Sequence, residues 1–141
     1  MIAHLVAALE ADTTLMGLLN AKSRRIYLQT SLGIGEHAAY PPKPFVVLSE
    51  LESFVHREVE EVSNARDRNF QFWAYDNEGD FVEIDKIISR FRDLVKGLRS
   101  FRTVDGIQVS ESRFTGISGS LTDSQYHSSC KWAGARFTSS Q

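Results

Sequence analysis

The sequence predicts an α+β fold: a mostly antiparallel β-sheet, one long amphipathic helix packed on a face, and a short N-terminal helical segment. Two extended runs, at residues 45–56 and 70–75, carry the apolar period of two that is typical of strands. After a turn at residues 76–79 the period changes to about 3.6 over residues 81–98. A long hairpin that feeds such a helix makes a unit in which the helix covers one sheet face.

The N-terminal part begins with apolar positions at helical spacing over residues 2–19. Asp12 interrupts this segment and is predicted to cap a second short turn, because its carboxylate can accept from free backbone amides. Residues 24–28 form a short strand candidate. Residues 29–43 contain glycines and prolines but no periodicity, and a loop of about fifteen residues is usually functional or mobile.

The hairpin is interrupted by a charged stretch at residues 56–64, which we expect to project beyond the sheet as an arm. Asp76 or Asn77 is predicted to cap the long helix. Acidic residues near the start of this helix and basic residues near its C-terminal end suit the helix macrodipole. The apolar stripe of this helix comprises Phe81, Ile84, Ile87, Ile88, Phe91, Leu94, Val95 and Leu98.

The C-terminal part is predicted to form two further strands, at residues 106–117 and 124–138, joined by a connection at residues 118–123. Both strands are rich in serine and only moderately apolar. We therefore expect them to be half-buried at best, with one sheet face against solvent or another subunit.

Length and composition favour a single domain over residues 1–141, without a membrane span or a signal peptide. The formal net charge of −2 argues against a protein that binds nucleic acid through its overall charge. The single cysteine, Cys130, excludes an internal disulfide and fits synthesis in a reducing cytoplasm.

Catalytic and metal-binding patterns are missing from the sequence. The four histidines lie far apart, so we expect no metal and no cofactor. Cys130 and His127 are three residues apart on a predicted strand and would point to opposite faces, so a buried structural thiol is expected. The recurring arginine pairs have acidic neighbours, including Asp67, Glu83 and Asp93, which indicates surface ion pairs.

Residues 3 to about 98 resemble, in order and spacing, the tail terminator (tail completion) proteins of long-tailed bacteriophages. The resemblance comes from the run Leu-Glu-Ala-Asp at residues 9–12, Thr-Leu-Met-Gly-Leu-Leu at 14–19 and Arg-Ile-Tyr at 25–27. A proline-bounded loop, the strand from residue 44, a charged hairpin, the aromatic strand at 70–75 and a helix near an aspartate follow. The loop at 29–43 departs from the family, and the last 40 or so residues match in β character alone.

The resemblance implies a non-enzymatic virion protein that forms a ring, usually of six subunits, after assembly in the host cytoplasm. Such a ring caps the tail tube protein, stops polymerisation and joins the tail to the head–tail connector or stopper protein, while DNA passes without specific binding. The charged arm and the loop are predicted to supply the interface, and acidic side chains facing the channel would repel DNA. The candidate interface residues are Arg57, Glu58, Glu60, Glu61, Arg66, Arg68, Gly33 and Tyr40.

Other classes remain open at this point. Another phage neck or head–tail connector protein would share the ring and the lack of chemistry. A small enzyme or ligand-binding α+β domain would need a pocket with convergent polar groups. A nucleic-acid-binding module would show salt-dependent binding to DNA.

Overall fold

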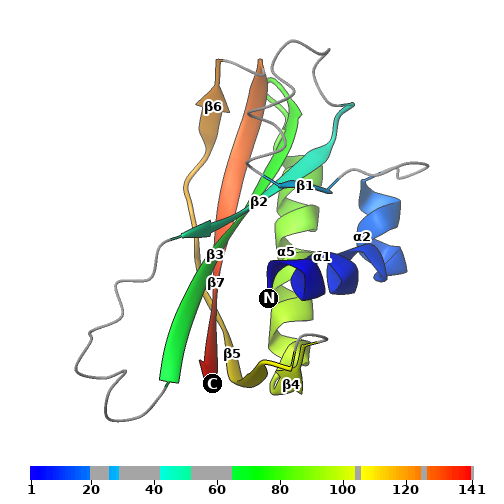
Figure 1. Cartoon of the computed structure of the whole chain (residues 1–141). Helices are drawn as coiled ribbons and strands as arrows, with labels where there is room; N and C mark the ends of the chain where they lie inside the picture. Colours follow the sequence, from blue (N-terminus) through cyan, green and yellow to red (C-terminus); the bar gives the residue numbers. More distant parts are fainter. Residues whose placement is uncertain (20–25, 29–41, 52–64, 104–105, 125–126, 141) are drawn as a thin grey trace.

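The computed structural model describes residues 1–19, 26–28, 42–51, 65–103, 106–124 and 127–140. Its elements, in chain order, are α1 (Ile2–Glu10), α2 (Thr13–Leu18), β1 (Ile26–Leu28), β2 (Phe45–Leu51), β3 (Ala65–Asn77), α5 (Val82–Leu98), β4 (Phe101–Arg102), β5 (Gln108–Ile117), β6 (Leu121–Asp123) and β7 (Ser128–Ser140). The fold is α+β and mostly β, as predicted. Figure 1 shows the three helices gathered on one side of the sheet.

The strands form one sheet in the order β1-β2-β3-β7-β5-β4, with β6 paired to β7. Among the described strands only β1 and β2 pair in parallel, and the other neighbouring pairs are antiparallel. The central pair is β3 with β7, two 13-residue strands that pair along their whole length. The last strand of the described chain therefore lies in the middle of the sheet.

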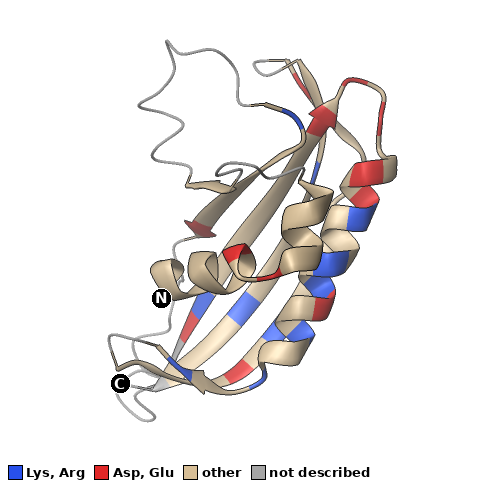
Figure 2. Ribbon diagram, turned by 90° about the vertical axis from the view of Figure 1, so that its right-hand side faces the viewer, with Lys and Arg blue, Asp and Glu red and all other residues tan. Residues whose placement is uncertain are grey.

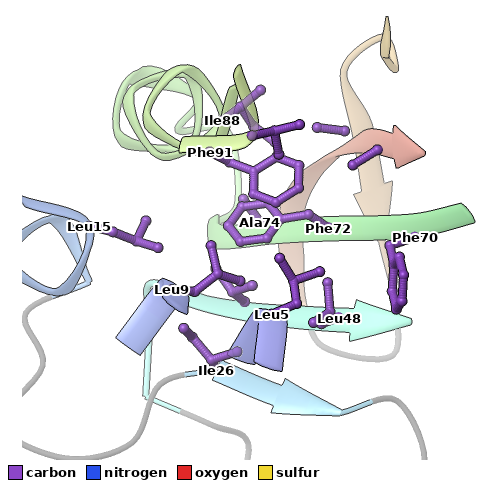
Figure 3. Packing of buried hydrophobic residues seen from close by; sticks show 14 of the residues in the cluster. Leu5, Leu9, Leu15, Ile26, Leu48, Phe70, Phe72, Ala74, Ile88 and Phe91 are labelled. Atoms are coloured by element: carbon purple, nitrogen blue, oxygen red, sulfur yellow. The ribbon is translucent and has the colours of Figure 1, made fainter. Parts of the chain in front are cut away.

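The main core lies between the helices and one face of the sheet. Alternation along β3 sends Phe72 and Ala74 to this face and Trp73 and Tyr75 to the other. The Phe91 ring of α5 stacks on the Phe72 ring with a centroid distance of 4.1 Å (Figure 3). The predicted stripe is confirmed, since its members Ile84, Ile87, Ile88, Phe91 and Val95 are the buried residues of α5.

The predicted N-terminal helical segment also packs on the helical side of the sheet. Leu5 and Leu9 of α1 and Leu15 of α2 are buried in the same core as α5 (Figure 3). The predicted break at Asp12 is confirmed, because its Oδ2 accepts from the Leu15 amide at 2.8 Å and caps α2. No helix of the described residues is long and apolar enough to cross a membrane.

The predicted cap of the long helix is wrong. Asp76 and Asn77 are the last residues of β3, where they pair with Ser129 and Ser128. The helix begins at Val82 without a side-chain cap at the residue before it. Asp80, which precedes the helix, instead accepts a hydrogen bond through Oδ1 from the Val82 backbone amide at 3.1 Å. This contact satisfies one of the free amides in the first turn of α5.

The C-terminal strands lie close to their predicted ranges, with two differences. The connection at residues 118–123 contains β6, because the chain turns back and pairs with the start of β7. Ser128, Ser129 and Ser139 are buried, so the predicted half-burial is wrong for them. For Ser129 the reason is visible, since its hydroxyl accepts from the Gly79 amide at 2.7 Å.

Candidate assembly surface

Among the described residues the sheet is open, and exposed apolar side chains lie near both of its edges. Four large hydrophobic residues are exposed among those described, and three of them are on strands near an edge. Leu51 is 43% exposed on β2, beyond the three residues that β1 covers. Ile117 of β5 is 47% exposed and Leu121 of β6 is 40% exposed. An open edge with apolar side chains favours pairing with another chain.

Part of the β5 edge is protected against such pairing. Its register shifts twice, between Val109 and Glu111 and between Phe114 and Gly116. Bulges of this kind twist an edge away from potential partners. Glu111 also forms an ion pair of 2.6 Å with Arg113 on the same strand. The part of the edge that remains suited to pairing therefore begins at Ile117 and continues into β6.

Most of the interface residues predicted from the sequence lie outside the described residues. These are Gly33, Tyr40, Arg57, Glu58, Glu60 and Glu61. Of the other two, Arg66 lies on β3 opposite Ser139, and only its backbone is described. Arg68 forms a two-pronged ion pair with Glu50 of β2, with nitrogen–oxygen distances of 2.6 and 3.0 Å. The structure therefore gives Arg68 a contact across the hairpin.

The arginines pair over longer distances in the chain than their sequence neighbours suggested. Arg90 of α5 makes two hydrogen bonds, of 2.9 and 2.7 Å, to the Asp12 carboxylate that caps α2. The hydrogen bond from Arg90 lowers the pKa of Asp12 below its usual value and raises that of Arg90. Asp67 accepts instead from the Thr138 hydroxyl at 2.8 Å. These contacts attach α2 to α5 and β3 to β7.

Cys130 is buried, as predicted, in a small cluster on the face of the sheet opposite the helices. Its neighbours there include Phe45 and Tyr75, whose rings stack at 4.7 Å. Burial, with a smaller effect from Asp123, raises the pKa of the Cys130 thiol to about 11, which disfavours the thiolate that a nucleophile requires. His127 is not on the strand as predicted, since β7 begins at Ser128.

A broad groove of about 540 Å³ lies between α2 and α5. Its charged side chains include both signs, and Arg90 is already paired with Asp12. No group of three or more metal-ligating side chains occurs among the described residues. The lining residues of the groove are Thr14, Leu18, Asp85, Lys86, Ser89, Arg90 and Asp93.

The comparisons with known proteins show a shared fold. No protein-family model matches the chain, and no curated protein matches it. Among solved structures, it is similar to a chain of the "virion of native gene transfer agent (GTA) particle", with a TM-score of 0.69 and 13% sequence identity. The match covers 99% of this chain and 93% of that one. The whole described architecture, from α1 to β7, thus has a counterpart in a protein of a virion particle.

Proposed function

We propose that this chain is a structural virion protein of a phage-like particle, and that it acts as the tail terminator. In this role it forms a ring of six subunits on the end of the tail tube, stops tube polymerisation and presents the surface that joins the head–tail connector. The observation that supports the proposal best is the fold shared over nearly the full length of both chains with a protein of a gene transfer agent virion.

The open sheet supports assembly in a ring. A subunit with two different edges forms a heterologous contact with its neighbour, and such contacts close into a ring when the rotation between subunits closes. The exposed apolar side chains of the two edges would then be covered by the neighbouring subunits. The resemblance of residues 3 to 98 to tail terminators selects this member of the virion class over other neck proteins.

The charged arm and the long loop would provide contacts with the neighbouring rings. In this arrangement Arg57, Arg66 and the loop residues around Gly33 and Tyr40 contact the tube protein or the connector. The acidic residues Glu58, Glu60 and Glu61 face the channel, where negative charge repels passing DNA. No cofactor takes part.

The experiment that tests the terminator role is deletion of residues 58–64 in the particle-producing cell. We expect a folded subunit with unchanged thermal unfolding, together with tails of uncontrolled length or tails without heads, counted by electron microscopy. A glycine–serine replacement of equal length is the matched control for the loss of spacing. Normal tail length and head joining in both variants would refute the role.

A second experiment tests the ring itself. Leu121→Lys places a charge on the exposed β6 edge, and we expect it to abolish ring formation, because the charge would be buried against the next subunit. Thr14→Lys, on the exposed side of α2, is the matched control. Particles that contain the subunit as a single copy would contradict a ring.

A further inference from the structure

The charges on the helical side of the molecule are separated along the axis of α5. Figure 2 shows acidic residues where α5 begins and mostly basic residues toward its end. The basic end consists of Arg92, Lys96, Arg99 and Arg102, with Asp93 as the acidic residue among them. The acidic end consists of Glu78, Asp80 and Glu83 at the surface, with the buried Asp76 beside them, and Glu83 pairs with Lys86 at 3.2 Å. A helix of 17 residues is about 25 Å long, so the two ends lie well beyond the Debye length of physiological salt.

The described residues neutralise the basic end only in part. Lys96 and Arg99 make no side-chain hydrogen bond or ion pair in the described part of the chain. Arg92 Nε lies 3.9 Å from an Asp93 oxygen, and this nitrogen is buried without a hydrogen-bond acceptor. Arg102 donates only to the neutral side chain of Gln108, at 3.4 Å. By contrast, Arg68 and Arg90 each make two hydrogen bonds to a carboxylate.

The helix macrodipole explains only part of this separation. It favours Glu83 in the first turn and Lys96 in the last. It does not explain Glu78, Asp80 or Arg102, which lie outside α5. The negative charges at the acidic end also act on one another, because Asp80 and Glu83 add to burial in raising the pKa of Asp76.

We propose that the basic end of one subunit docks against the acidic end of a second copy of the chain. The proposal rests on the proposed function, because it adds a charged contact between neighbouring subunits of the ring to the contact of their sheet edges. The acidic end includes Val82, which is 64% exposed, so an apolar centre with a charged rim forms there. At the basic end, the partly buried side chains of Leu98 and Phe101 lie close in sequence to the cations and could provide its apolar part. The opposite charges of the two ends fix the relative orientation of the two subunits, because contact between two identical ends would bring like charges together.

The described basic end suits a protein surface better than a nucleic acid. Proteins that bind single strands combine cations with aromatic rings that stack on bases. Phe101, which lies between Arg99 and Arg102 in the sequence, is already stacked on His4 with a centroid distance of 4.7 Å. The chain as a whole carries a net charge of −2. A second copy provides the complementary negative charge within the same sequence.

The test uses charge reversal at one end or at both ends of the full chain. Lys96→Glu with Arg99→Glu makes both ends acidic. Glu78→Lys with Asp80→Lys and Glu83→Lys makes both ends basic. We expect each variant alone to associate at least about tenfold more weakly than the wild type, because like charges then meet. An equimolar mixture should assemble again, and a chain with all five substitutions should assemble by itself. Sedimentation and electron microscopy measure assembly, and thermal unfolding confirms that each variant folds.

The matched control reverses two exposed arginines of the sheet, Arg113→Glu with Arg136→Glu, and should assemble as the wild type does. Wild-type association should weaken as salt rises from about 0.1 M to about 1 M. The inference is overturned if the wild type stays monomeric at low salt, or if the variant with both ends acidic assembles normally. Normal assembly with loss of DNA binding in that variant would assign the basic end to nucleic acid instead.

The outcomes also separate this inference from the proposed function. If the ends associate as expected but give open filaments instead of closed rings, the end-to-end contact is correct and the terminator ring is wrong. If rings form in the particle and are insensitive to every reversal, the ring is correct and the end-to-end contact is wrong.

Discussion

Replacing Phe91 by alanine tests whether α5 holds the helical side to the sheet. The Phe91 side chain is fully buried, stacks on Phe72 at 4.1 Å and meets Phe114 edge-on at 6.4 Å. Removing a buried phenylalanine ring costs about 3–5 kcal/mol of unfolding free energy, because contacts are lost and a cavity remains. Unfolding entropy is about 2.1 cal/mol/K per residue, or about 0.3 kcal/mol/K for 141 residues. We therefore expect the Tm to fall by about 10–17 °C.

The assay is thermal and urea unfolding followed by circular dichroism. Val82→Ala on the same helix is the control, since this side chain is 64% exposed and its truncation should change stability by less than about 0.5 kcal/mol. An unchanged Tm for Phe91→Ala would refute the reasoning, because the ring could not then lie in the core. Equal losses in the two variants would show that helix propensity, and not packing, decides the result.

Substitutions at three further sites test local contacts. Asp12→Asn keeps the cap on α2 but removes the charge that pairs with Arg90, whereas Asp12→Ala also loses the cap and should cost about 1 kcal/mol more. Because the pKa of Asp12 is lowered in the folded state, the charged carboxylate stabilises the fold above about pH 4, and this stabilisation is lost as pH falls further. Equal urea midpoints for the wild type and Asp12→Asn at every pH would contradict this. Burial raises the pKa of Asp76, so stability should fall as pH rises through that pKa, and Asp76→Asn should be more stable than the wild type at pH 7. A variant with no gain at pH 7 and an unchanged pH dependence would contradict this. Gly134→Ala brings a methyl group against the Thr115 hydroxyl and should cost about 1–3 kcal/mol, but little in a Thr115→Ala background. Equal costs in the two backgrounds, in a double-mutant cycle of unfolding free energies, would contradict the contact.

The parts of the fold that follow from periodicity could be predicted from the sequence. The stripe of α5 repeats every three to four residues, and burial of one helix face requires that pattern. The aromatic strand at residues 70–75 alternates between a face toward the helices and a face away from them, as a strand between two apolar surfaces must. The cap at Asp12 could be predicted because it depends on residues only three apart.

The features that depend on distant partners could not be predicted in this way. Asp76 and Asn77 have the chemistry of helix caps, but pairing with β7 keeps them in β3. The strand β6 is only three residues long and exists because β7 extends beyond the end of β5. For the candidate surface, the sequence shows which residues are charged. Which of the arginines pair with a carboxylate depends on the fold, because a partner such as Asp12 for Arg90 is distant in the sequence.

The central position of β7 affects how the chain folds. Every residue of β3 pairs with a residue from beyond α5, β4, β5 and β6, so the middle of the sheet consists of contacts that are distant in sequence. Such contacts form slowly, because a long segment of chain must close before the first of them forms. Until β7 enters, β3 and β5 each lack a neighbour on the side that it will occupy. Unpaired strands in incomplete chains are the usual starting points of aggregation. Truncation before Ser128 should therefore give insoluble protein and not a smaller folded domain.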